Sequence, residues 1–170
     1  MQFPAKRALF FALLCLASIP SALAQDSQHK TTKFRPLTRH EGLSILRVAL
    51  DSHHRAGSVS DCSHLVHALY ERAGFPYQYA PSSDLYAGIE EFRRVAKPQP
   101  GDLAVWPGHA GVVVNPAQHS FFSMLSSGPG VDSYNSPYWK QRGRPRFFRY
   151  IKQVPTGVLS TSVRTTSLKP

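Results

Sequence analysis

The sequence contains little cysteine, few acidic residues and no long apolar run. Cys15 and Cys62 are the two cysteines among 170 residues. The apolar run Ala8–Ala17 is shorter than the about 20 residues that a membrane-spanning helix needs. No internal repeat and no Gly-rich phosphate-binding loop occurs along the chain. The sequence therefore gives no indication of a membrane-spanning, repeat or nucleotide-binding protein.

Acidic residues are half as frequent as basic ones. Ten Asp and Glu stand against 20 Lys and Arg, for a net charge of +10. A basic surface favours anionic partners such as nucleic acid, acidic lipid or cell-wall polymer. Which of these applies depends on where the protein acts.

The first 24 residues indicate that the protein is exported. Lys6 and Arg7 precede the apolar run, and Ala22-Leu23-Ala24 ends the segment, which is the order of a secretory signal peptide. Cleavage before Gln25 predicts a secreted or periplasmic protein without a stable membrane anchor. It would also remove Cys15, leaving Cys62 as a single cysteine, which in an exported protein suggests a reactive thiol or an intermolecular disulfide. Among anionic partners, export favours the cell wall over nucleic acid.

The remaining chain is long enough for one domain. The polar segment 25–37 predicts a flexible leader, 38–151 the folded domain, and the Ser- and Thr-rich segment 152–170 a disordered tail. Thr38 and Glu41 fit a capping box and predict a first helix that ends near Gly57.

A second predicted helix covers Ser60–Gly74. Leu65, Val66 and Leu69 form its apolar stripe, and Gly74 provides a stop. Cys62 lies in its first turn, where free N–H groups and the helix dipole favour negative charge, so a thiol there ionises more readily than an ordinary one. A small buried core residue is the alternative interpretation of Cys62.

The second half of the domain has the pattern of an antiparallel sheet. We predict a short helix within 83–92, a firm turn at 98–101, and a loop at 126–130. Four strands are predicted, over 103–106, 109–114, 120–125 and around 147–150. His109 begins the second of them, directly after Pro107-Gly108. A cysteine at a helix start and a histidine at a strand start are the minimum for thiol catalysis, although a single histidine is more often structural.

Three motifs resemble the NlpC-type cell-wall peptidases, a family of papain-like cysteine peptidases. Residues 61–66, DCSHLV, resemble the family's D-C-S-G-L-V; residues 100–106, PGDLAVW, resemble P-G-D-L-V-F-W; and residues 109–114, HAGVVV, resemble H-V-G-I-Y-L. Their order and spacing agree over roughly 38–150. The resemblance implies an α+β fold of the papain type, in which N-terminal helices with the nucleophile at a helix start pack on an antiparallel sheet.

The resemblance also implies site residues. Cys62 and His109 would form the catalytic pair, and Asp61 and Ser63 would hold a free amine of the substrate, unless they only cap the helix. The family's third catalytic residue, often a histidine, falls on Ser123, which hairpin pairing also places opposite the start of the His109 strand. An ordinary strand residue is the alternative interpretation of Ser123.

Two other histidines need separate treatment. His64 replaces the family glycine and would either crowd the cleft or add a polar contact. His119 would pair near Val114, five residues from His109 and so roughly 16 Å away. We therefore do not assign His119 to the site.

The implied activity is hydrolysis of peptidoglycan stem peptides, after γ-D-glutamate and before a diamino acid. Two alternatives remain: an amidase that cuts between the glycan and L-alanine, and a wall-binding protein that has lost activity. The latter is suggested by His64, by Ser123 and by the absence of the family's aromatic-rich segment before the cysteine. We expect a monomer with no metal and no cofactor.

Overall fold

The computed structural model describes residues 33–53 and 61–154. The predicted signal peptide, the leader up to residue 32, the predicted end of the first helix near residue 57 and the tail beyond residue 154 lie outside the described residues. Residues 152–154, also predicted to belong to the tail, instead form the end of strand β7 (Arg146–Val154). Among the helices that are described, none combines the length and apolar character needed to cross a membrane.

Two N-terminal helices have the caps that the sequence predicts. At the start of α1 (Arg39–His53), the Glu41 carboxylate accepts from the Thr38 amide at 2.9 Å, and the Thr38 hydroxyl accepts from the Glu41 amide at 3.3 Å. The second helix, α2 (Cys62–Arg72), begins after Asp61, whose carboxylate accepts from two amides of the first turn. It is followed by Gly74 with a φ of 85°, a conformation that favours glycine. The capping box and the position of Cys62 at a helix start are thus confirmed.

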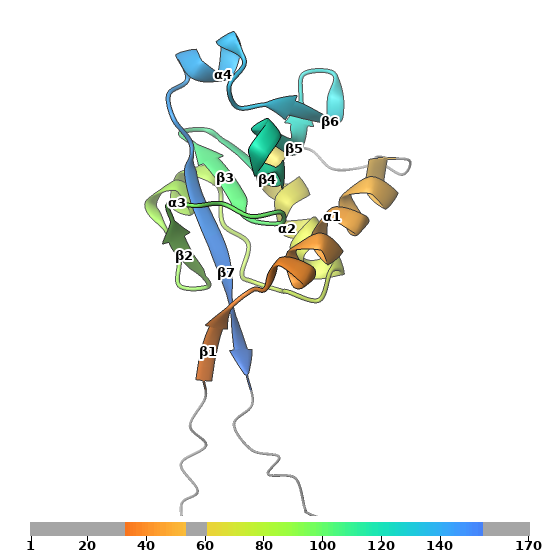
Figure 1. The fold of residues 1–170 in the computed structure, drawn as a ribbon, viewed down its shortest axis with the longest axis vertical. Coiled ribbons are helices and arrows are strands. Elements are labelled where there is room, and N and C mark those ends of the chain that lie inside the picture. The colour runs from red at the N-terminus through yellow and green to blue at the C-terminus, as the bar shows by residue number, and fades with distance from the viewer. Residues whose placement is uncertain (1–32, 54–60, 155–170) are drawn as a thin grey trace, which may run out of the picture.

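Seven strands form one antiparallel sheet with the order β1-β7-β3-β4-β5-β6, and β2 pairs with β7 (Figure 1). The strands are β1 (Lys33–Pro36), β2 (Phe92–Val95), β3 (Leu103–Trp106), β4 (His109–Asn115), β5 (Ser120–Leu125), β6 (Gly128–Ser133) and β7 (Arg146–Val154). The protein is therefore a mixed α+β fold in which N-terminal helices pack on an antiparallel sheet.

Several boundaries differ from those predicted. Residues 33–36, placed in the leader, form β1, which pairs with the end of β7 and is tied to α1 by two hydrogen bonds from Arg35 to Glu41. The predicted helix at 83–92 is shorter, α3 (Ser82–Ala87), and its last residue belongs to β2. The expected loop at 126–130 runs into β6, because backbone pairing with β5 overrides the weak strand propensity of its Gly-Pro-Gly start. A further helix, α4 (Pro137–Gln141), was not predicted.

The sheet is buried on both faces at its centre, since all four residues of β3 are buried. One face packs against α1 and α2 in a core that contains Leu69, Leu103 and Val112. The other face carries a smaller aromatic cluster with Trp106, Phe121 and, from α4, Trp139. Alternate residues of each strand therefore enter different clusters.

The PGD segment before β3 is structural. The Asp102 side chain is buried and accepts from Arg149 Nε at 2.9 Å and Nη2 at 2.8 Å, which joins this turn to β7. Gly42 of α1 and Gly101 lie backbone to backbone, so that a Cβ on Gly42 would stand 2.0 Å from the Pro100 carbonyl oxygen.

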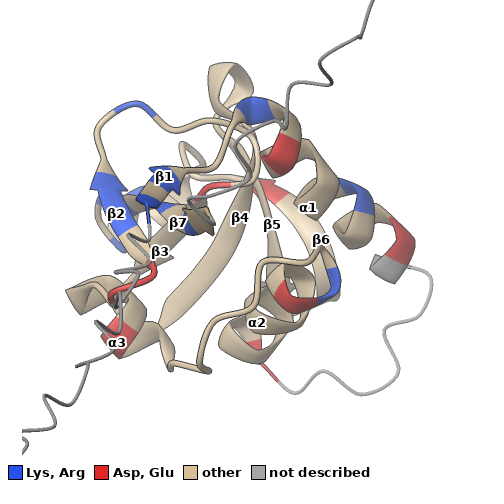
Figure 2. Ribbon diagram, turned by 90° about the horizontal axis from the view of Figure 1, so that it is seen from below, with Lys and Arg blue, Asp and Glu red and all other residues tan. Residues whose placement is uncertain are grey.

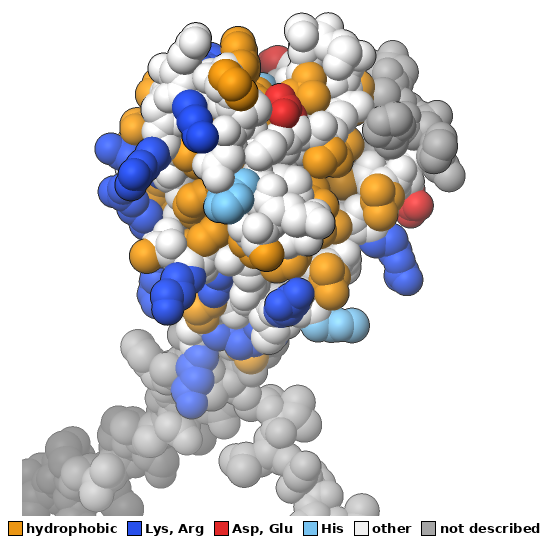
Figure 3. Space-filling model, turned by 45° about the horizontal axis from the view of Figure 1, so that its top comes forward, with side chains coloured by type: hydrophobic (Ala, Val, Ile, Leu, Met, Phe, Trp, Pro, Cys, Tyr) orange, Lys and Arg blue, Asp and Glu red, His pale blue; other side chains and the backbone are white. Residues whose placement is uncertain are grey.

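Basic residues are concentrated on part of the surface. Figure 2 shows Lys and Arg along β1 and β2, and Arg93 and Arg94 of β2 are exposed. In the space-filling view, Lys and Arg side chains gather along one side of the molecule (Figure 3).

Candidate active site

His109 is the first residue of β4 and is largely buried, with 8% of its surface exposed. It follows the two-residue turn that links β3 to β4, where Trp106 pairs with His109. Its ring lies against three aromatic rings, with centroid distances of 4.6 Å to Trp139, 6.1 Å to Trp106 and 6.3 Å to Phe121. The imidazole therefore belongs to the aromatic face of the sheet.

Ser123 holds one nitrogen of this imidazole. Its Oγ lies 2.8 Å from His109 Nε2 and 2.5 Å from the Ala110 carbonyl oxygen. A carbonyl oxygen can only accept, so the single hydroxyl proton goes to Ala110 and the hydroxyl accepts from Nε2–H. The hydrogen-bond network thus assigns the Nε2–H tautomer, with the Nδ1 lone pair left free.

A glycine in β4 makes room for this contact. Gly111 is the next residue after His109 on the same face of β4, and a Cβ there would stand 2.6 Å from Phe121 Cδ2 and 3.0 Å from Ser123 Cβ. A side chain at this position would separate β4 from β5. The family-like H-x-G pattern therefore has a packing reason in this structure.

The environment of His109 disfavours its charged form. Burial, and then the positive charge of Arg142, lower the pKa of His109 from 6.5 to about 4. The imidazole is therefore neutral at pH 7 and its Nδ1 lone pair is available, but it is a weaker base than an ordinary histidine.

Cys62 is a free, half-buried thiol at the first position of α2. It lies on the same helix face as Val66 and Leu69, and α2 packs against β4 and β5, the strands of His109 and Ser123. Among the described residues, no hydrogen bond joins Cys62 to His109. The structure joins His109 and Ser123 by a hydrogen bond, whereas in the described part of the chain no such bond links the Cys62 thiol to either residue.

The residues around Cys62 form a second polar cluster. Asp61 Oδ1 accepts from the Ser63 amide at 2.8 Å, the Ser63 hydroxyl at 2.7 Å and the His64 amide at 2.9 Å. Asp61 Oδ2 accepts from His64 Nδ1 at 2.7 Å. Partial burial alone would raise the pKa of Asp61, but these hydrogen bonds outweigh it and lower the pKa from 3.8 to about 2.

Tyr79 closes this cluster and was not identified from the sequence. Its ring stacks on His64 with centroids 4.3 Å apart, and its hydroxyl lies 3.2 Å from Ser63 Oγ. His64 therefore adds a polar contact at the site, and the carboxylate of Asp61 is occupied by groups of its own helix start.

His119 lies away from the site. It occupies the turn between β4 and β5 with a φ of 57°, is exposed, and packs edge-on against Tyr134 at 5.2 Å. Within residues 33–53 and 61–154, no group of three or more His, Cys, Asp or Glu side chains is placed to hold a metal ion.

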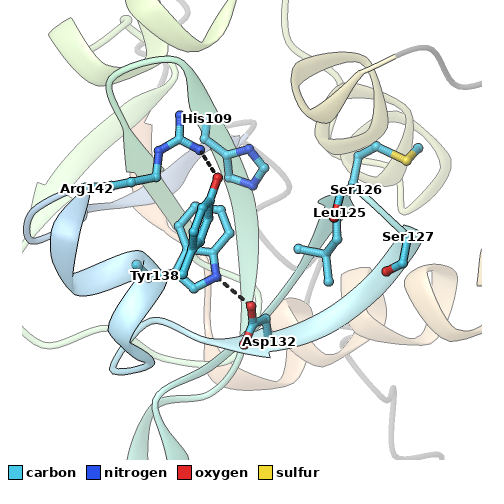
Figure 4. Close-up of a pocket in the computed structure, with 9 residues that line it drawn as sticks. His109, Leu125, Ser126, Ser127, Asp132, Tyr138 and Arg142 are labelled. Carbon is cyan, nitrogen blue, oxygen red and sulfur yellow. Dashed lines mark hydrogen bonds between the residues drawn. The ribbon is translucent and has the colours of Figure 1, made fainter.

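A cavity of about 390 Å³ opens beside His109 (Figure 4). It lies between α4 and the hairpin of β5 and β6, and its lining includes Trp139 and Arg142 but not Cys62. These two residues were not predicted, since α4 itself was not. The Tyr138-Trp139 pair next to basic residues was the available sequence signal.

A scan against models of known protein families finds no match to this chain, and a search of curated proteins finds none either. The resemblance to the NlpC-type peptidases therefore rests on the three short motifs.

Proposed function

We propose that the protein is an exported cysteine peptidase of the papain-like, NlpC type that hydrolyses peptidoglycan stem peptides. The observation that carries the proposal is the hydrogen bond from His109 Nε2 to Ser123, which leaves Nδ1 as the free base of a neutral imidazole. Cys62, a free thiol at a helix start, supplies the nucleophile. The predicted signal peptide supports a secreted or periplasmic location.

In the proposed reaction, His109 Nδ1 takes the proton of Cys62 Sγ as the sulfur attacks the amide carbonyl carbon. The C–N bond breaks, the leaving nitrogen receives the proton from Nδ1–H, and a thioester remains on Cys62. Water, deprotonated by Nδ1, then hydrolyses the thioester and regenerates the thiol. Amides at the start of α2 are suited to bind the oxyanion of each step.

This sequence of steps requires Sγ and Nδ1 to come within hydrogen-bond distance. The described residues contain no such contact, so substrate binding or a local movement has to provide it. Asp61 and Ser63 border the thiol and are our candidates for substrate contacts, with His64 and Tyr79 shaping that side of the site.

A wall-binding protein without activity is the second candidate. The lack of a hydrogen bond between Cys62 and His109 among the described residues favours it, as does the occupation of the Asp61 carboxylate by His64. The basic side of the molecule suits an anionic wall under either hypothesis.

Digestion of purified sacculi separates these hypotheses. Wild-type protein and Cys62→Ala are incubated with sacculi, and the released fragments are analysed by mass spectrometry. We expect wild-type protein to release peptides that begin with the diamino acid, and Cys62→Ala to release none. Fragments that begin with L-alanine would indicate the amidase instead. Co-sedimentation of both proteins with sacculi, without any release, would overturn the enzyme and support the binder.

A further inference from the structure

The cavity beside His109 has walls of different character. One wall is the aromatic pair Tyr138 and Trp139 of α4, and the opposite side is formed by Met124, Leu125 and two serines of the β5–β6 turn. Asp132 of β6 and Arg142 complete the lining. Figure 4 shows Arg142 and Asp132 at opposite ends of Tyr138, with His109 facing the same space.

The aromatic wall is anchored in the fold. Trp139 is 2% exposed, packs against Trp106 at 4.7 Å and Phe121 at 5.0 Å, and donates from Nε1 to Asp132 at 2.7 Å. Because Trp139 is fixed by the core, the short helix α4 presents the following residues at a defined place.

Arg142 is positioned on this wall without a carboxylate partner. Its guanidinium lies 5.4 Å from the Trp139 ring centroid and 5.8 Å from that of Tyr138, and Nη1 donates to the Tyr138 hydroxyl at 3.3 Å. Among the described residues, no Asp or Glu forms an ion pair with it. A planar guanidinium held over aromatic rings is suited to bind a carboxylate through two hydrogen bonds.

The opposite end of the cavity has a different role. Both carboxylate oxygens of Asp132 already accept, one from Trp139 and the other from the Ser133 amide at 2.6 Å. Its negative charge repels an anion, so a carboxylate in the cavity is directed towards Arg142.

We propose that this cavity receives the leaving-group side of the substrate and that Arg142 recognises a carboxylate there. The inference rests on the proposed function. A histidine that protonates the leaving nitrogen must border the leaving group, and this cavity is lined by His109 but not by Cys62. Arg142 thereby determines specificity for substrates whose leaving residue carries a free carboxylate.

Binding of the carboxylate also assists the chemistry. Arg142 is one of the two causes that lower the pKa of His109. A carboxylate on Arg142 offsets this positive charge, so the imidazole holds the proton for the leaving nitrogen more readily when the correct substrate is bound.

The test uses two peptides that differ in one group: L-alanyl-γ-D-glutamyl-L-lysine with its terminal carboxylate free or as the carboxamide. Binding is measured by calorimetry with Cys62→Ala, so that it is separate from hydrolysis. We expect the free acid to bind at least about tenfold more tightly than the amide. Arg142→Met should abolish this difference, and Arg142→Lys should keep part of it.

Arg144→Met is the matched control, because Arg144 is exposed nearby but does not line this cavity. It should leave the preference unchanged. Equal affinity for the two peptides, no binding of either, or an equal effect of Arg144→Met would overturn the subsite. If Arg142 governs the preference but wild-type protein cleaves neither peptide nor sacculi, the subsite stands and the proposed peptidase activity fails. Cleavage of both peptides at equal rates, unaffected by Arg142→Met, would leave the activity standing and remove the subsite.

Discussion

His109 and Ser123 form a hydrogen bond of 2.8 Å across two neighbouring strands, in which Nε2 donates and the hydroxyl accepts. The direction follows from the second contact of the hydroxyl, its donation to the Ala110 carbonyl at 2.5 Å. Ser123 thus acts on the candidate base as a positioning residue. It fixes the tautomer and the orientation of the ring and contributes no charge.

Ser123→Ala should lower peptidoglycan turnover about two- to twelvefold, because it removes one neutral hydrogen bond worth about 0.5–1.5 kcal/mol. The loss should appear in kcat rather than KM, since Ser123 is fully buried and outside the cavity lining. Ser120→Ala, in the same strand and bonded to Asn115, is the control and should retain turnover. Unchanged turnover in a folded Ser123→Ala protein would mean that the hydrogen bond does not serve catalysis.

Gly111→Ala should disrupt the same contact from the neighbouring strand. The added Cβ would stand 2.8 Å from the Phe122 carbonyl oxygen as well as close to Ser123, so β5 has to move. We expect a loss of about 1–3 kcal/mol in the free energy of unfolding, together with a loss of turnover. Urea denaturation and the sacculus assay measure the two effects.

Gly130→Ala is the matched control for this substitution. Gly130 lies in β6, and a Cβ there would meet only a flexible leucine side chain at 3.3 Å and a backbone oxygen at 3.9 Å. Equal destabilisation by both variants would show that Gly111 is not specially constrained.

His109→Ala should abolish turnover, and His119→Ala should retain most of it. His119 occupies an exposed turn position and contacts Tyr134, whereas His109 is held by Ser123. His109→Gln fills more of the volume left in the aromatic cluster and tests whether the loss comes from chemistry rather than unfolding. Similar residual turnover in His109 and His119 variants, with both proteins folded, would remove His109 from the mechanism.

The sequence predicts those parts of the fold whose signals are local. Thr38 and Glu41 cap α1 through their own side chains, and Gly74 ends α2 because of its own φ. The β4–β5 hairpin, which the sequence predicts, brings Ser123 near His109. Its exact pairing depends on a register shift between Val113 and Asn115 that the sequence does not reveal.

The remaining elements depend on partners far along the chain. β1 forms because β7 pairs with it, and α4 is held by the burial of Trp139 against Trp106. The cavity and the position of Arg142 depend on α4. Because the sequence analysis did not predict α4, it did not predict them either. The three motifs predicted which residues belong to the candidate site. They did not predict how these residues are arranged, because the packing of both clusters determines the sheet face on which His109 lies.

The lowered pKa of His109 predicts how stability changes with pH. In the unfolded chain this histidine has an ordinary pKa of about 6.5, and in the folded protein burial and Arg142 lower its pKa to about 4. Between these values the unfolded chain binds a proton that the folded protein does not. Above pH 6.5, His109 therefore does not lower the free energy of unfolding. As the pH falls from 6.5 towards 4, protonation of this histidine in the unfolded chain decreases that free energy.

The expected loss is about 2–3 kcal/mol between pH 7 and pH 4.5, a range that lies above the ordinary pKa values of Asp and Glu. Urea denaturation at both pH values measures it. His109→Gln should remove most of this decrease, because glutamine does not titrate, and His119→Gln, at an exposed position, should retain it. If wild-type protein and His109→Gln lose the same free energy on acidification, the imidazole takes up its proton in the folded protein, and a neutral His109 is not the resting base of the site.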